Sequence, residues 1–139
     1  MMKAITFLLA AFIFATTVFG QDVQKPTGKT KLLIYYFHVT HRCNTCQSIE
    51  NTTKKVLDTY YGKELKDGTI IFQSFNCELP ENKKLVDKYQ AYGATLAFTP
   101  IVKGKEAGID DQTNFAFSKI NKEEVFTDGL KEKIDSYIK

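Results

Sequence analysis

The sharpest chemical feature of the chain is a pair of cysteines, Cys43 and Cys46, separated by two residues. Thiols at this spacing in the first turn of a helix lie on the same side, so they can close a disulfide with each other. The unpaired N–H groups and the dipole at a helix N-terminus stabilise a thiolate. The pattern predicts a redox pair in which Cys43 is the attacking thiol and Cys46 the resolving one.

Neighbouring side chains are suited to lower the pKa of the Cys43 thiol. Arg42 adds a fixed positive charge and His41 a titratable one, and both favour the thiolate form of Cys43. Two other interpretations stay open. His38, His41, Cys43 and Cys46 have the ligand types for a Zn or Cu(I) site, and the pair could form an inert structural disulfide. The predicted strand–helix–strand surroundings favour redox chemistry.

The third cysteine, Cys77, follows a second predicted strand in the run Asn76-Cys77-Glu78. If that strand is parallel to the strand before Cys43, Cys77 lies at the same edge of the sheet as the cysteine pair. It is then either a half-buried small residue or a third redox thiol or metal ligand.

Composition narrows the protein class. The 139 residues are 43% hydrophobic and 13% aromatic, which is enough for one packed core and excludes a disordered chain. The net charge of +3 is dispersed without a run of like charges, so no nucleic-acid partner is expected. The glycines occur singly and form no phosphate-binding loop.

Residues 1–20 have the pattern of a signal peptide, with Lys3 before an apolar run, and we expect cleavage before Gln21. An uncleaved N-terminal anchor is the alternative, and no other membrane contact is expected. We therefore predict an exported, periplasmic protein, with secretion as a further alternative, in a compartment where a cysteine pair is oxidised unless something reduces it. Residues 21–30 form a polar lead-in to a single domain over 31–139.

Periodicity predicts the order βαβαββα. The expected strands are 31–39, 69–75 and 95–102, with a weak strand from Glu106 after a turn at 103–105. The first expected helix opens with the Cys43–Cys46 motif, with Cys43 at the exposed cap position, and runs to a stop at Gly62. The others run from Pro80 to a stop at Gly93, and from a capping pair, Asn121 and Glu124, to Ile138. The sequence pattern over 107–120 favours neither a helix nor a strand. The sum is an α/β fold with a mixed central sheet and helices on both faces.

This arrangement resembles the thioredoxin-like family over nearly all of residues 31–139. The resemblance rests on the first apolar strand, the Cys43–Cys46 motif that opens a helix, the helix ending in KYQAYG, the turn at 103–105 and the C-terminal helix. More narrowly, YYFHVTHRCNTCQSIE (35–50) is similar to small exported thioredoxin-like proteins classed as a nitrophenyl-compound nitroreductase subunit, a class associated with an arsenic-resistance operon.

The resemblance implies a protein that relays electrons to or from the thiols or disulfides of a partner protein and serves cell redox homeostasis. Its redox group would be a Cys43–Cys46 disulfide, with no other cofactor, because the sequence has no flavin-binding motif. An enzymatic role would be that of a thiol–disulfide oxidoreductase. The alternative is a non-enzymatic periplasmic metal-binding protein, or an electron-relay subunit of a nitroreductase-type system.

Two departures from thioredoxins limit the comparison. Thioredoxins place a buried acid six residues before the first cysteine, where this chain has Phe37, so the proton of Cys46 must go to water or a nearby histidine. Their cis-proline position, counted back from Gly104, falls at Leu96, whereas Pro100 lies inside the predicted strand. Either that strand is shorter or the loop lacks its proline. Because this proline discourages metal binding in the family, its loss strengthens the metal alternative.

Overall fold

The central strand β1 (Leu32–His38) is buried at every position from Leu32 to Phe37. The computed structural model describes residues 22–139, so the predicted signal peptide lies outside the described residues. The other elements, in chain order, are α1 (Asn44–Tyr60), α2 (Gly62–Asp67), β2 (Ile70–Asn76), the 3-10 helix η1 (Pro80–Asn82), α3 (Lys83–Tyr89), β3 (Thr95–Val102), β4 (Lys105–Glu106), β5 (Asp110–Asp111), α4 (Thr113–Lys119) and α5 (Glu123–Ile138).

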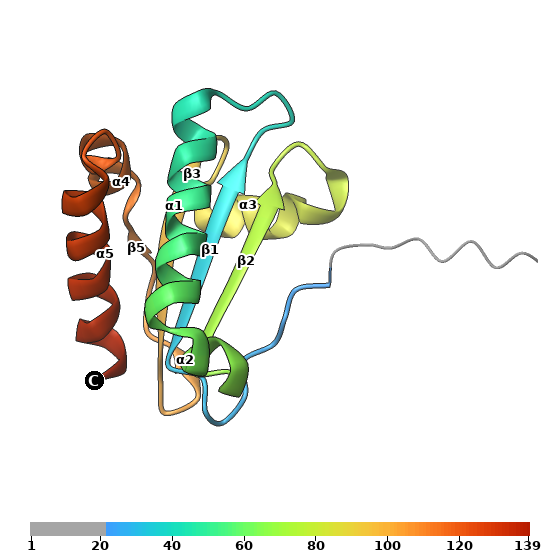
Figure 1. The fold of residues 1–139 in the computed structure, drawn as a ribbon. Coiled ribbons are helices and arrows are strands. Elements are labelled where there is room, and N and C mark those ends of the chain that lie inside the picture. Colours follow the sequence, from blue (N-terminus) through green and yellow to red (C-terminus); the bar gives the residue numbers. More distant parts are fainter. Residues whose placement is uncertain (1–21) are drawn as a thin grey trace, which may run out of the picture.

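The sheet is mixed, with the strand order β2-β1-β3-β4, and β5 also pairs with β3. β2 runs parallel to β1, because a helical crossover joins them, while β3 is antiparallel on the other side of β1. The register sets His38 opposite Asn76, so the segments that follow β1 and β2 leave the sheet at the same edge. Figure 1 shows these two strands side by side and pointing the same way.

Alternation along β1 divides the core into two clusters. Leu32, Ile34 and Tyr36 pack with the apolar sides of α1 and α5, whereas Leu33 and Phe37 pack with the side chains of α3. Figure 1 shows α1 and α5 on one side of the sheet and α3 on the other. The predicted fold class, a mixed sheet with helices on both faces, is confirmed. Among residues 22–139, no helix is long and apolar enough to span a membrane.

Several helix ends differ from the predictions. The start of α1 agrees with the prediction, because the helix begins at Asn44 and Cys43 is its N-cap. α1 ends at Tyr60, close to the predicted stop at Gly62, but Gly62 itself begins a second helix, α2. α2 ends at Asp67, and its C-cap Gly68 has a φ of 80°, which suits a residue without a Cβ. α3 ends at Tyr89, with Gln90 as its C-cap, before the predicted stop at Gly93.

The C-terminal third also departs from the predictions. The capping pair of Asn121 and Glu124 is wrong, because the N-cap of α5 is Lys122 and no side chain caps that helix. Residues 107–120, which had no assignment, contain β5 and α4. A side-chain turn forms there, in which the Thr113 N–H donates to Asp111 Oδ1 at 2.8 Å, just where α4 begins.

Pro100 settles the question left open by the sequence. β3 is not shortened, since it continues through Pro100, and no peptide bond in residues 22–139 is cis, so the loop lacks its proline. The flanking Ile101 N–H donates to Lys31 O at 2.8 Å, while the Pro100 carbonyl accepts from Ala107 N at 2.8 Å. The backbone nitrogen of Pro100 therefore faces away from β1, on the side of β3 that pairs with the two-residue strand β4. A strand tolerates proline at such a position because no hydrogen bond to the central strand is lost.

The packing of α5 on the sheet yields a stability prediction. Leu130 is fully buried, whereas Val125 on the same helix is 46% exposed. Leu130→Ala should lower the free energy of unfolding by about 2–5 kcal/mol, because it removes buried methyl groups and leaves a cavity. Val125→Ala should change it by no more than about 0.5 kcal/mol. Urea denaturation of both variants checks this, and equal losses would contradict the described packing of α5.

Candidate functional site

Cys43 and Cys46 are joined by a disulfide at the start of α1, with their Cα atoms 5.1 Å apart. Cys43 is exposed and has extended backbone angles, as an N-cap residue does, while Cys46 is half-buried in the first turn. The Cys46 N–H donates to Cys43 Sγ at 3.0 Å. The sulfur of Cys43 thus occupies the position where a helix terminus stabilises negative charge.

Tyr36 ties this first turn to the sheet. Its side chain is fully buried, and its hydroxyl donates a 2.8 Å hydrogen bond to the backbone oxygen of Cys46. Burial raises the pKa of Tyr36 to about 12, although the nearby Arg42 charge opposes this shift. The phenol therefore stays protonated and remains a donor at neutral pH. Its partner is a main-chain atom, so the sequence offered no signal for this contact.

Arg42 turns toward the helix that follows it. Its guanidinium forms an ion pair with Glu50 Oε2 and lies over the Tyr36 ring, with 5.9 Å between the guanidinium carbon and the ring centroid. The Gln47 side chain donates to the Arg42 carbonyl at 3.2 Å, which holds the backbone of Arg42 as well. The fixed positive charge predicted at Arg42 is therefore paired with a carboxylate.

Glu50 is the main site residue that sequence reasoning missed. It is 3% exposed, and Lys54 Nζ lies 2.7 Å from its Oε1. Burial by itself would raise the pKa of Glu50, but hydrogen bonds from Lys54, Arg42 and Ser74 outweigh it and lower the pKa to about 2. The signal was its place on the buried stripe of α1, between Ile49 and Thr53, where a carboxylate is unexpected.

The four residues of the alternative metal site do not form one, and Cys43 and Cys46 are bonded to each other instead. His38 is half-buried, with Nδ1 3.1 Å from the backbone oxygen of Val39, and His41 is exposed. Within the part of the chain that the structure describes, no three His, Cys, Asp or Glu side chains are placed to share a metal ion. The four-ligand site of His38, His41, Cys43 and Cys46 is therefore not assembled here.

Cys77 lies at the same edge of the sheet as the cysteine pair, as predicted for a parallel β1–β2 arrangement. Its N–H and its thiol both donate to His38 O, at 2.8 and 3.1 Å. Burial raises the pKa of the Cys77 thiol, and the Glu78 charge adds to this. The adjoining Glu78 carboxylate accepts from Thr40 N at 2.7 Å and so fastens the segment after β2 to the segment before α1. These contacts give Cys77 a structural setting.

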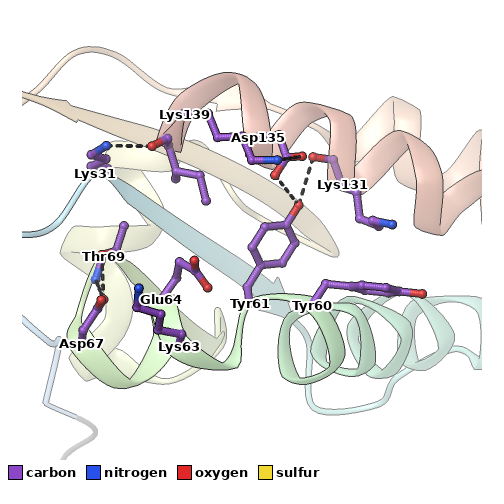
Figure 2. Close-up of a pocket in the computed structure, with 11 residues that line it drawn as sticks. Lys31, Tyr60, Tyr61, Lys63, Glu64, Asp67, Thr69, Lys131, Asp135 and Lys139 are labelled. Atoms are coloured by element: carbon purple, nitrogen blue, oxygen red, sulfur yellow. Dashed lines mark hydrogen bonds and ion pairs between the residues drawn. The ribbon is translucent and has the colours of Figure 1, made fainter.

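A cavity of about 420 Å³ lies at the other end of the sheet, between the C-terminal ends of α1 and α5 (Figure 2). Its charged and polar groups largely satisfy one another: Lys139 pairs with Asp135 at 2.6 Å, the Tyr61 hydroxyl donates to Asp135 Oδ1 at 2.8 Å, and Lys31 Nζ donates to Ile138 O at 2.7 Å. None of its lining residues belongs to the cysteine site.

No protein-family model and no curated protein matches the sequence. Among solved structures, the chain is similar to a thioredoxin from Fasciola hepatica (18% identity, TM-score 0.41, covering 66% of this chain and 79% of that one). It is also similar to the germline-specific thioredoxin Deadhead of Drosophila melanogaster (17%, 0.41, 58% and 67%). A third is a thioredoxin from Thermus thermophilus (22%, 0.38, 66% and 72%).

None of these structures concerns the nitroreductase-subunit proteins that residues 35–50 resemble, so that closer relationship stays a prediction. The strand order and directions, together with a disulfide-bonded pair at the start of α1, support thiol–disulfide redox chemistry.

The setting of Cys77 predicts slow alkylation. In the oxidised protein Cys77 is the free thiol, since Cys43 and Cys46 are bonded to each other. Because its pKa is raised, a smaller fraction is thiolate at pH 8 than for an ordinary cysteine. Iodoacetamide should modify native oxidised protein several-fold more slowly than the same protein in urea, as followed by mass spectrometry. Equal rates would contradict the described burial of the thiol.

The buried Glu50 carboxylate predicts a stability change in acid. Its pKa is about 2 in the folded chain against an ordinary value of 4.5, so its stabilising contribution is present above pH 4.5 and is lost as the pH falls toward 2. The difference in free energy of unfolding between wild type and Glu50→Gln should narrow over that window, by at most about 1.4 kcal/mol for each pH unit. Chemical denaturation at several pH values measures it.

Glu123→Gln is the matched control for this experiment, because Glu123 is exposed and pairs with Lys55 on the surface at 2.6 Å. Its difference from wild type should stay nearly constant over the same window. A constant difference for Glu50→Gln as well would contradict the ion-paired state of Glu50.

Proposed function

We propose that the protein passes two electrons to or from a partner protein by cycling Cys43 and Cys46 between disulfide and dithiol. The observation that carries the proposal is the exposed residue Cys43 at the N-cap of α1, whose sulfur accepts the Cys46 N–H at 3.0 Å. An exposed sulfur can be reached by another protein, and the helix terminus stabilises the thiolate that must attack or leave. Cys46, half-buried behind it, is placed to resolve a mixed disulfide.

In the reducing direction, the Cys43 thiolate attacks one sulfur of a partner disulfide. A mixed disulfide forms, and one partner thiolate leaves and takes up a proton. Cys46 then gives up its proton and attacks Cys43 Sγ, which breaks the mixed disulfide and releases the second partner thiolate. The protein's dithiol is oxidised and the partner's disulfide is reduced by two electrons. The reverse sequence oxidises a partner dithiol.

The proton of Cys46 goes to water or to a nearby histidine such as the exposed His41. Phe37 lies in the apolar cluster on the α3 side of the sheet, so it offers no acid–base group. Glu50 has a pKa of about 2 and is already paired with two cations, so it is a poor proton acceptor at neutral pH.

The proposed setting is the periplasm, supported by the signal-peptide pattern of residues 1–20. The proposed partner is a protein bearing thiols or disulfides, and the similarity of residues 35–50 to nitroreductase-subunit proteins supports an electron-relay role beside a nitroreductase-type enzyme. In that role the cysteine pair would carry the electrons and the partner would hold the cofactor that reduces the nitro group.

Single-cysteine variants test the cycle. Wild type should accelerate the reduction of insulin by dithiothreitol, whereas Cys43→Ser and Cys46→Ser should each lose nearly all of that turnover, because each lacks one half of the exchange. Cys46→Ser should accumulate a mixed disulfide with oxidised glutathione through Cys43, visible as an added mass. Cys77→Ala is the matched control and should keep wild-type turnover.

The same preparations distinguish the competing function. A wild-type protein that has no turnover, and that after reduction binds one Zn or Cu per chain through Cys43 and Cys46, would overturn the redox proposal in favour of metal binding. Metal analysis of protein purified without chelator provides that measurement.

A further inference from the structure

The buried carboxylate of Glu50 lies one helical turn beyond Cys46, and a buried charge in such a place needs an explanation. Both of its oxygens are engaged, Oε2 by Arg42 and Oε1 by Lys54. Arg42 is the residue directly before Cys43. The Arg42–Glu50 ion pair therefore links the segment that leads into Cys43 to α1, the helix that contains Cys46.

We propose that Glu50 is a positioning residue that sets the reduction potential of the Cys43–Cys46 pair by holding the Arg42 guanidinium against α1 and balancing its charge. This inference rests on the proposed function. The reaction concerned is the exchange of the protein disulfide with two thiols of a reductant such as glutathione, which gives the protein dithiol and oxidised glutathione, with two electrons and two protons transferred to the protein.

The sign of the effect follows from charge. A negative charge close to the pair disfavours thiolate and a positive charge favours it, and a stabilised thiolate makes the disulfide easier to reduce. Glu50 therefore lowers the reduction potential, both directly and by offsetting Arg42. Arg42 raises it. A role confined to folding would make the removal of either partner act in the same direction, through loss of stability.

The charged and titratable surroundings of the first turns of α1 come from three elements and two loops. They are His41 and Arg42 from the loop before α1, Glu50 and Lys54 from α1, Tyr36 from β1 and Glu78 from the loop after β2, and Ser74 of β2 donates to Glu50. Tyr36 remains neutral because its pKa is about 12, and the Glu78 carboxylate accepts a hydrogen bond from Thr40 N. The substitutions below therefore change the net charge of the Arg42–Glu50–Lys54 group.

The test is the equilibrium of the full-length protein with reduced and oxidised glutathione at pH 7, read by acid quenching and thiol alkylation. Glu50→Gln should raise the equilibrium constant for reduction of the disulfide by roughly three- to tenfold. Arg42→Gln should lower it by a similar factor. Arg42→Lys should restore most of the wild-type value because it keeps the charge.

The double variant Arg42→Gln/Glu50→Gln isolates the pair. With both charges gone, its equilibrium constant should return to within about twofold of wild type, even though its stability is lower. Glu123→Gln makes the same chemical change at the exposed Lys55–Glu123 pair and should leave the constant unmoved. The rate of Cys43 alkylation against pH gives a second readout, in which Glu50→Gln lowers the pKa of the thiol and Arg42→Gln raises it.

The inference would be overturned if Glu50→Gln and Arg42→Gln changed the equilibrium constant in the same direction. It would also be overturned if their changes were no larger than that of Glu123→Gln. If Glu50→Gln does not fold well enough to measure, Arg42→Gln and Arg42→Lys still decide, because a charge effect requires a lower constant for Arg42→Gln and a constant near wild type for Arg42→Lys. Failure of the proposed function is read separately, from insulin turnover by wild type, since glutathione equilibration reports the potential of any accessible disulfide.

Discussion

Coverage of β1 on both faces is the constraint on which the rest of the structure depends. The strand has apolar side chains in both directions, so it must lie between α1 and α5 on one side and α3 on the other. This fixes the point where β1 ends and therefore where the chain can turn into α1. The buried Tyr36 of this strand donates its hydroxyl hydrogen bond to Cys46 O, which fixes the position of the first turn of α1 relative to the sheet. The cysteine pair is thus positioned by the core, even though Cys43 itself is exposed.

The parts of the fold that could be predicted are those with a strong local signal. An unbroken apolar run marks β1, and the spacing of Ile49, Val56 and Leu57 marks the face of α1. The parts that could not be predicted are short and depend on distant partners. α4 begins where Asp111 accepts from Thr113 N, and Thr113 Oγ1 in turn accepts from Leu96 N, a residue of β3. A contact of that kind leaves no periodicity in the sequence.

The site shows the same division. The motif itself and its place at a strand–helix junction followed from spacing, and the position of Cys77 followed from the parallel pairing of β1 and β2. The direction of Arg42 did not, because adjacency in sequence says nothing about where a long side chain points. Its partner Glu50 could have been noticed as a carboxylate on a buried stripe. That it meets Arg42 and Lys54 there is a tertiary fact.

Two kinds of electrostatic support act on the Cys43 sulfur, and they differ in how freely sequence can change them. The N–H groups at the start of α1 belong to the backbone, so they stabilise a thiolate whatever side chains surround it. The charges of Arg42, Glu50 and Lys54 belong to side chains, so a single substitution can change each of them. The backbone therefore makes thiol chemistry available at this position, and the buried charge group adjusts its potential. The ion pairs that hold the pKa of Glu50 at about 2 also place its charge one helical turn from Cys46, so tuning of the adjacent cysteines is a physical reason for its presence there.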